Sequence, residues 1–233
     1  MKDVIIALDF KDREEVMEFL REFTEPVYVK VGMELYYAEG PSIVPEIKTL
    51  GHKVFLDLKF HDIPNTVMGA VRSASSLDVD MMNLHAMGGG EMMRCAMEAL
   101  NHKEVKPLMI AVTILTSMDE DALKNELHVE FPLEDEVLSL AKMTKDSGLQ
   151  GVVCSALEVP RLKEKLGKDF LTITPGIRPL ESALGDQRRV VTPSMARELG
   201  SDYIVVGRPI TEAEYPYEVY KKIRNEFLGG EER

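Results

Sequence analysis

The sequence predicts a single-domain α/β protein whose fold class is the closed (β/α)8 barrel, or TIM barrel. Eight short apolar segments alternate with amphipathic stretches that have helical spacing. No low-complexity tract, Pro/Ser-rich linker or change of composition divides residues 1–233 into separate domains. The length of 233 residues also suits this fold, because α/β barrels commonly need roughly 200–250 residues as one unit.

Eight segments have the composition of β-strands. Several of them are continuous apolar runs, as expected of parallel strands that are covered on both faces. Their uninterrupted alternation with helices predicts a parallel sheet that closes on itself. In chain order the strand candidates are Val4–Asp9, Tyr28–Met33, Lys53–Lys59, Met81–Ala86, Pro107–Leu115, Gly151–Ala156, Leu171–Ile177 and Tyr203–Arg208.

Amphipathic stretches lie between these segments. Asp12 and Glu15 have the spacing of a capping box, which predicts the start of the first helix. The long segment Ser117–Pro132 has room for a short extra helix, and the connection Gly176–Thr192 follows the seventh strand, where barrel enzymes often build phosphate sites or lids. Apolar residues recur at helical spacing in three sets: Val16, Phe19, Leu20 and Phe23; Leu133, Val137, Leu140 and Ala141; and Val219, Ile223 and Phe227.

An open, doubly wound sheet is the alternative architecture. Such sheets usually carry a Gly-rich fingerprint directly after the first strand. Here Asp9 is followed by Phe10, Lys11 and Asp12, so that fingerprint is missing. The closed barrel is therefore the preferred prediction.

Composition restricts the classes of partner. A net charge of -12 and a pI near 5.0 argue against nucleic-acid binding, which usually needs a basic face. Cys95 and Cys154 each lie in an apolar segment without a second cysteine nearby, as in a protein of the reducing cytosol. The first residues lack the basic and then apolar pattern of a signal peptide, and no apolar run approaches the roughly 18 residues of a membrane span. We therefore expect a soluble, cytoplasmic protein with no membrane partner.

Strand periodicity predicts charged residues inside the barrel. Successive side chains alternate between the two faces of a strand, and the apolar faces suit the helix layer. Three of the inward charges also fall at C-terminal strand ends, the catalytic face of this fold. A buried ion network that only fixes strand register is the structural alternative, but desolvation makes such a network costly, which favours a functional role. The predicted inward charges are Asp9, Lys30, Asp57 and Lys59.

The segment Leu56–Val67 reads L-D-L-K-F-H-D-I-P-N-T-V. Its D-x-K-x-x-D spacing is shared by sugar-phosphate decarboxylases and synthases of one barrel superfamily, whereas the adjoining H-D-I-P-N-T is more specific. The segment closely resembles the signature of the orotidine 5'-phosphate decarboxylase family. Further matches to that family run through the chain at Ala7–Asp9, Tyr28–Gly32, His85–Gly89, Val112–Ser117, Thr174–Pro179, Gly185–Val190 and Val205–Thr211.

The resemblance implies conversion of orotidine 5'-phosphate to UMP and carbon dioxide, the last step of de novo pyrimidine synthesis, without a metal or organic cofactor. In the implied catalytic set, Lys59 donates the proton, Asp57 flanks it, and Asp62 reaches the site of a neighbouring subunit. The nucleotide would thus bind to a homodimer with shared active sites. The implied substrate-binding residues are Asp9 and Lys30 for the ribose, Ile63 and Thr66 across the interface, Thr116 for the pyrimidine, and Arg178, Gln187, Gly207 and Arg208, which bind the phosphate or close over it.

These implied roles make chemical sense. Loss of carbon dioxide from C6 of the pyrimidine leaves an anion that the ring delocalises poorly. An ammonium group held at that carbon stabilises the developing charge and then supplies the proton. Carboxylates flanking Lys59 favour its charged form. Contacts to the phosphate, remote from C6, can supply binding energy that closes the site.

Two other functions fit parts of the pattern. A magnesium-dependent sugar-phosphate decarboxylase or aldolase of the same superfamily would need a carboxylate metal site and would lose activity to a chelator. A catalytically silent phosphate-binding barrel would lack charges at the catalytic positions, whereas all of them are present here. Because one fold hosts many functions, only the site distinguishes these possibilities.

The remaining candidates have simpler interpretations. His61 is expected to have a structural or interface role rather than an acid–base one, because strand parity is lost in its loop and catalytic candidacy needs geometry. His85 is expected to have a hydrogen-bonded core role, because it lacks a matching carboxylate or second His at ligand spacing. Arg188 and Arg189 receive no role. Methionines 81, 82, 92, 93 and 97 follow strand or helix spacing and are expected to pack in the core. The histidines expected to face solvent are His52, His102 and His128.

Overall fold

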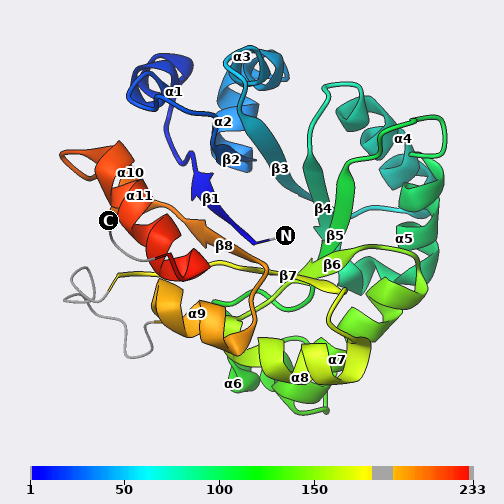
Figure 1. The fold of residues 1–233 in the computed structure, drawn as a ribbon. Coiled ribbons are helices and arrows are strands. Elements are labelled where there is room, and N and C mark those ends of the chain that lie inside the picture. Colours follow the sequence, from blue (N-terminus) through cyan, green and yellow to red (C-terminus); the bar gives the residue numbers. More distant parts are fainter. Residues whose placement is uncertain (1, 180–190, 231–233) are drawn as a thin grey trace.

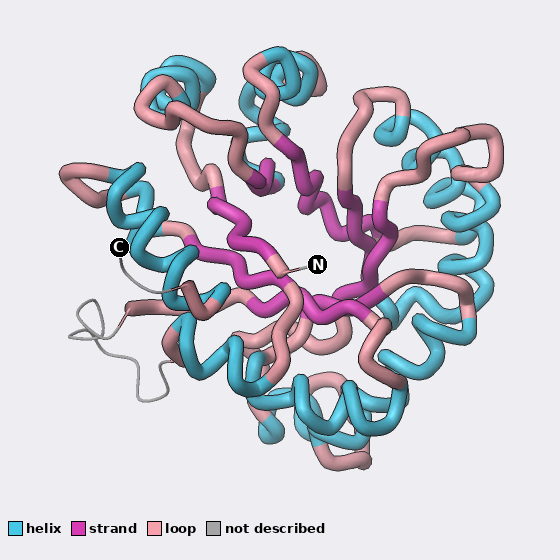
Figure 2. Tube along the Cα trace, viewed as in Figure 1, coloured by secondary structure: helices cyan, strands magenta, loops and turns pink. Residues whose placement is uncertain are grey.

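The computed structural model describes residues 2–179 and 191–230, and eight parallel strands form a closed barrel in it (Figure 1). Each strand pairs with the next in chain order, and β1 pairs with β8 to close the ring. Helices surround this ring on its outside (Figure 2). The predicted fold class is thereby confirmed, and the open-sheet alternative is excluded.

The strands are short, as the apolar segments predict. They are β1 Asp3–Ala7, β2 Tyr28–Gly32, β3 Lys53–Phe60, β4 Met81–His85, β5 Leu108–Val112, β6 Gly151–Val153, β7 Leu171–Thr174 and β8 Tyr203–Val206. The α-helices are α1 Arg13–Leu20, α2 Met33–Glu39, α3 Ile43–Thr49, α4 Pro64–Ser75, α5 Gly89–Glu98, α6 Glu120–Asn125, α7 Leu133–Asp146, α8 Val159–Leu166, α9 Pro193–Leu199, α10 Arg208–Thr211 and α11 Pro216–Leu228. Two 3-10 turns, η1 Ala86–Gly88 and η2 Ala156–Glu158, precede α5 and α8.

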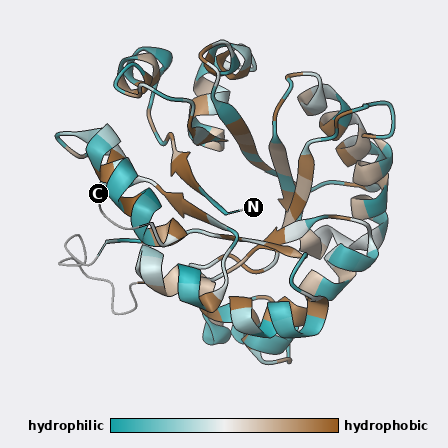
Figure 3. Cartoon of the chain, in the orientation of Figure 1, coloured by the Kyte–Doolittle hydropathy of each residue, from teal (hydrophilic) through white to brown (hydrophobic). Residues whose placement is uncertain are grey.

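Two layers of apolar side chains stabilise the barrel. The larger layer lies between the strands and the surrounding helices. Figure 3 shows hydrophobic residues concentrated along the strands and hydrophilic residues on the helices around them. The smaller layer fills the barrel interior, as side chains do in barrels of this size, and consists of Ile5, Ala7, Tyr28, Phe55, Met81, Ile110, Ile173, Tyr203 and Val205.

Most helix predictions are confirmed. The Asp12 side chain accepts a hydrogen bond from the Glu15 backbone N–H at 3.0 Å and caps α1. The helix ends at Leu20, so Phe23 packs in the core from the following turn. The extra helix expected in Ser117–Pro132 is α6, whose N-cap is Asp119.

Several strands end earlier than their apolar patterns predict. The sixth candidate extended to Ala156, but β6 ends at Val153 because the Ser155 side chain caps η2 and turns the chain away from the sheet. The eighth candidate extended to Arg208, but β8 ends at Val206 and Arg208 begins α10. The loops that follow these strands supply part of the barrel mouth.

His52 corrects one sequence expectation. Its side chain is buried rather than solvent-facing, and its Nδ1 accepts a hydrogen bond from the Val27 backbone N–H at 3.1 Å. Burial lowers the pKa of His52, so the ring is held neutral as an acceptor. This bond fixes the entry of β2 next to β3. His102 and His128 are exposed, as predicted.

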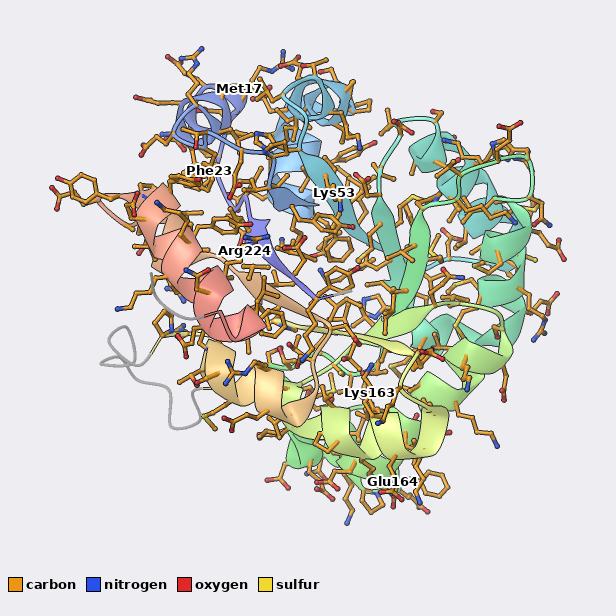
Figure 4. The ribbon with its side chains drawn as sticks, viewed as in Figure 1. Met17, Phe23, Lys53, Lys163, Glu164 and Arg224 are labelled. Atoms are coloured by element: carbon orange, nitrogen blue, oxygen red, sulfur yellow. The ribbon has the colours of Figure 1, made fainter. Side chains whose placement is uncertain are left out.

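A structural ion pair stabilises the end of the barrel at which the strands begin. Lys163 on α8 pairs with Asp202, and it also donates to the Phe170 carbonyl oxygen at 2.8 Å (Figure 4). Asp202 in turn accepts from the backbone N–H of Thr172 at 2.8 Å. These bonds attach α8 to the start of β7 and β8. Across residues 2–179 and 191–230, no helix is both long and apolar enough to cross a membrane.

Candidate active site

Three charged side chains from adjacent strands meet at the mouth of the barrel. Lys59 Nζ lies 2.7 Å from Asp57 Oδ1, and Lys30 Nζ lies 3.4 Å from Asp57 Oδ2. The register pairs Lys30 with Phe55 and Gly32 with Asp57, which brings β2 charges beside β3 charges. Two ammonium groups therefore bind different oxygens of one carboxylate, on the barrel side to which strand parity assigned these charges.

Asp57 is the negative centre of this cluster. Burial alone would raise its pKa. The charges of Lys30 and Lys59, with hydrogen bonds from Lys59 and Asn83, outweigh burial and lower the Asp57 pKa below its ordinary value. The carboxylate is consequently ionised at neutral pH and loses its charge only as the pH falls through that lowered pKa.

The backbone of Lys59 has an unusual conformation. Its φ is 50°, in the left-handed region, and the β3–β4 register shifts between Leu56 and Phe60. A non-glycine residue in this region costs about 1–3 kcal/mol, and it persists only where its surroundings hold it there. Lys59 N–H donates to Asn83 Oδ1 at 2.8 Å, and Asn83 Nδ2 donates to Asp57 Oδ1 at 2.6 Å. This bulge re-aims the Lys59 side chain at the strand end.

Asp9 extends the cluster toward the rim. Lys30 Nζ donates to Asp9 Oδ1 at 3.1 Å, so Lys30 bridges Asp9 and Asp57. Gly32 leaves room for this bridge, since a Cβ there would lie 3.0 Å from Lys30 Nζ. The four predicted inward charges thus form one connected chain, with Asp9 at its exposed end.

A pocket of about 220 Å³ opens beside this cluster. Lys30, Asp57 and Lys59 supply its charged lining, and Thr116 is its uncharged polar residue. The rest of the lining is apolar: Phe55, Val112, Ile114, Leu115, Val153, Ile173, Pro175 and Val205. Charged groups beside a largely apolar cavity act in a low dielectric, where each interaction with a bound charge is strengthened.

A second cavity, of about 320 Å³, contains the predicted phosphate-binding arginines. Arg178 and Arg208 both line it, together with Pro209, Glu212 and Ala213. Arg178 follows Ile177, which bridges to Val191, while Arg208 begins α10 directly after Gly207. Two segments 30 residues apart in sequence numbering therefore place guanidinium groups around one cavity. Gln187, Arg188 and Arg189 lie outside the described residues.

The predicted interface residues lie elsewhere on the rim. Asp62 is exposed, and its Oδ1 accepts from the Ile63 backbone N–H at 2.6 Å. In the described part of the chain, no ion pair joins Asp62 to Lys59. Ile63 is 68% exposed at the start of α4, and Thr66 is exposed one turn later. The described chain therefore brings together Asp57 and Lys59 but leaves Asp62 outside their cluster.

His61 and His85 lie next to this rim. Their ring centroids are 5.5 Å apart. Burial lowers the pKa of His85, and the nearby His61 and Lys59 lower it further, so the ring is neutral at neutral pH. Within the described ranges, no group of three or more His, Cys, Asp or Glu side chains is arranged to hold a metal ion.

Sequence reasoning did not single out two residues of the site. Asn83 is fully buried in β4 and joins Asp57 to the Lys59 backbone, while Gly32 leaves space for the Lys30 ammonium. An asparagine in the middle of an otherwise apolar strand is a detectable signal, because strands disfavour Asn and buried amides need partners. The space left by Gly32 depends on a side-chain position that no sequence pattern gives.

The family comparison matches nearly the whole chain. Residues 2–223 match the model of the "Orotidine 5'-phosphate decarboxylase / HUMPS family". A curated relative from Bacillus cereus (strain G9842), named orotidine 5'-phosphate decarboxylase, is 55% identical over 234 aligned residues that cover 98% of each chain. A relative of the same name from Bacillus mycoides (strain KBAB4) has the same identity and coverage.

Two solved structures are similar to this chain over nearly its whole length. The crystal structure of orotidine 5'-phosphate decarboxylase from Lactobacillus acidophilus superposes with a TM-score of 0.88 at 44% identity, covering 97% of this chain and 99% of that one. A structure described as an uncharacterized conserved protein from Geobacillus kaustophilus superposes with a TM-score of 0.87 at 47% identity, covering 96% and 99%.

Proposed function

The chain belongs to the orotidine 5'-phosphate decarboxylase / HUMPS family and acts as an orotidine 5'-phosphate decarboxylase, and from this premise we propose that Lys59 is its proton donor. The enzyme is a carboxy-lyase of pyrimidine biosynthesis. The observation that carries the mechanism is the Lys59–Asp57 ion pair, 2.7 Å long, in the wall of a largely apolar pocket.

In the proposed step, the bond between C6 and its carboxylate breaks, and the electron pair stays on C6 as carbon dioxide leaves. The Lys59 ammonium stabilises this developing charge and then transfers a proton to C6, which gives UMP. The neutral amine regains a proton from solvent. Asp57 holds Lys59 in position, and its retained negative charge repels the substrate carboxylate in the ground state.

The rest of the site binds the nucleotide. We assign the ribose hydroxyls to Asp9 and Lys30, whose connected charges present both an acceptor and a donor. Thr116, which lines the largely apolar pocket, contacts the pyrimidine. Arg178 and Arg208 bind the phosphate in the second cavity with Gly207 beside them, and we assign Gln187 to the same phosphate. Because the phosphate is far from the reacting carbon, its binding energy can be used to close the site.

We also propose that the enzyme is a homodimer with shared active sites. Asp62, Ile63 and Thr66 are exposed at the start of α4, although the family resemblance places them beside a Lys59. A second copy whose α4 meets the barrel mouth would bring Asp62 into the charged cluster. Two-fold symmetry would then build two identical sites from both chains.

Decarboxylation should continue unchanged in excess EDTA. Every proposed step uses only amino-acid side chains and solvent, so removal of divalent cations takes away no reactant. The measurement is the loss of orotidine 5'-phosphate absorbance with EDTA-treated enzyme, compared with the same enzyme in magnesium. A rate that EDTA abolishes and magnesium restores would instead support the metal-dependent alternative.

Replacement of Arg208 by alanine should lower kcat/KM for orotidine 5'-phosphate about 10- to 100-fold, since a hydrogen bond to a charged group contributes about 1.5–3 kcal/mol. The nucleoside orotidine, which lacks the phosphate, should be affected far less. Arg224→Ala is the matched control, because Arg224 lies on α11 near Asp3 at the opposite end of the barrel. An equal loss with both substrates would show that Arg208 does not act on the phosphate.

A further inference from the structure

We propose that Asn83 is a positioning residue that holds Lys59 and Asp57 in the geometry needed for protonation at C6. The inference rests on the proposed role of Lys59 as proton donor. Asn83 lies on β4, a strand adjacent to β3 (Figure 1). Its side chain is fully buried. It does not line the substrate pocket, so it would act on the reaction only through its two partners.

Both ends of the Asn83 amide bind the catalytic pair. Its Oδ1 accepts from the Lys59 backbone N–H at 2.8 Å, and its Nδ2 donates to Asp57 Oδ1 at 2.6 Å. That same Asp57 oxygen accepts from Lys59 Nζ at 2.7 Å. Asn83, Asp57 and Lys59 thus form a closed ring of hydrogen bonds that includes both the backbone and the ammonium of Lys59.

The ring admits only one orientation of the amide. The Lys59 backbone N–H requires an acceptor, and the ionised Asp57 requires a donor, so exchange of the amide oxygen and nitrogen would break both bonds. Aspartate would keep the acceptor but place a second carboxylate against Asp57. Leucine, which has a similar branched shape, would supply neither group.

The conformation of Lys59 explains why the bond to its backbone matters. Lys59 has a φ of 50° at a register shift between β3 and β4. A residue with a Cβ stays in this region only where its surroundings fix it. Without Asn83, the backbone N–H would lose its buried acceptor, and the chain would be free to relax toward extended β geometry. The ammonium would then be aimed away from C6.

The decisive variant is Asn83→Leu. We expect kcat to fall about 100-fold, because a displacement of about 1 Å in a catalytic group can cost that factor. Affinity for UMP, which carries no charge at C6, should change less than about threefold, since its phosphate and ribose contacts are untouched. Affinity for a uridine 5'-phosphate analogue with an anionic oxygen at C6 should fall about as much as kcat, because that anion lies where the carbanion forms.

Two further variants control for stability. Asn83→Ala removes the same bonds without adding a bulky apolar group, and it carries the test if the leucine variant does not fold. Thr174→Val removes another fully buried hydrogen-bonding group, one that bonds to Ser201 and Tyr203 away from the charged cluster. We expect Thr174→Val to lower thermal stability while kcat and the ratio of the two affinities stay at wild-type values.

Three outcomes would overturn the inference: near wild-type kcat in the Asn83 variants, equal losses of affinity for UMP and the anionic analogue, or an equal loss of kcat in Thr174→Val. The underlying function is tested separately by Lys59→Ala. If Lys59→Ala is inactive while the Asn83 variants are active, only the positioning role fails. If Lys59→Ala remains active, the proposed proton donor itself is wrong.

Discussion

Replacement of Lys59 by alanine should lower kcat by at least about 10⁴-fold. General-acid catalysis contributes about 10²–10⁴, and a preorganised electrostatic partner contributes a further factor of about 10²–10³. Lys59 is proposed to supply both effects from one ammonium group. The loss should fall mainly on kcat, because the ribose and phosphate contacts of the substrate remain in place.

Lys53→Ala is the matched control for this experiment. Lys53, labelled in Figure 4, begins the same strand and is exposed. It lies at the other end of β3 from Lys59 and does not line the pocket. Its removal should leave kcat unchanged. Titration with UMP, monitored by calorimetry, would verify that the Lys59 variant still forms the binding site. Substantial turnover by a correctly folded Lys59→Ala enzyme would contradict the mechanism and favour another proton source.

Strand periodicity predicted the charged cluster because it is a strict geometric rule. Side chains alternate along a regular strand, which assigns Lys30 and Asp57 to the barrel interior. Lys59 joins them at a bulge, where regular alternation along β3 is interrupted. The register then placed Lys30 beside Asp57. Fold and cluster follow from the same pattern, since a closed barrel is what brings the ends of neighbouring strands together.

The details that sequence did not predict depend on single hydrogen bonds. The left-handed backbone of Lys59 is accompanied by a bond from its N–H to Asn83, and the buried His52 ring accepts from the Val27 N–H. Strand ends were overextended for a related reason: apolar residues continue past Val153 into a turn that the Ser155 side chain caps. Hydrophobic patterns predict which residues are buried, but they do not predict which polar side chain ends a β-strand.

The position of Asp62 predicts that two inactive variants restore activity when they are mixed. Its carboxylate accepts from the Ile63 N–H and forms no ion pair with Lys59 within the described residues. Lys59→Ala and Asp62→Ala should each be inactive alone. In a shared-site heterodimer of the two, one site carries both lesions and the other carries neither. Mixing after dissociation and reassembly should therefore restore activity to about one quarter of wild type, given random pairing through a two-fold interface.

The Lys59→Ala/Asp62→Ala double variant supplies a control, because in this mixture shared sites predict less activity than single-chain sites. Mixed with an equal amount of wild type, a shared-site heterodimer carries one lesion in each site, so activity per total protein should be about one quarter of wild type. If each site belonged to a single chain, this mixture would retain about one half, and mixing the two single variants would restore nothing. Turnover after reassembly, with heterodimers verified by mass spectrometry, decides between these results. Retention of one half by the double-variant mixture, with no activity in the mixture of single variants, would assign Asp62 to its own chain and reject the shared site. Decarboxylation through Lys59 would still stand.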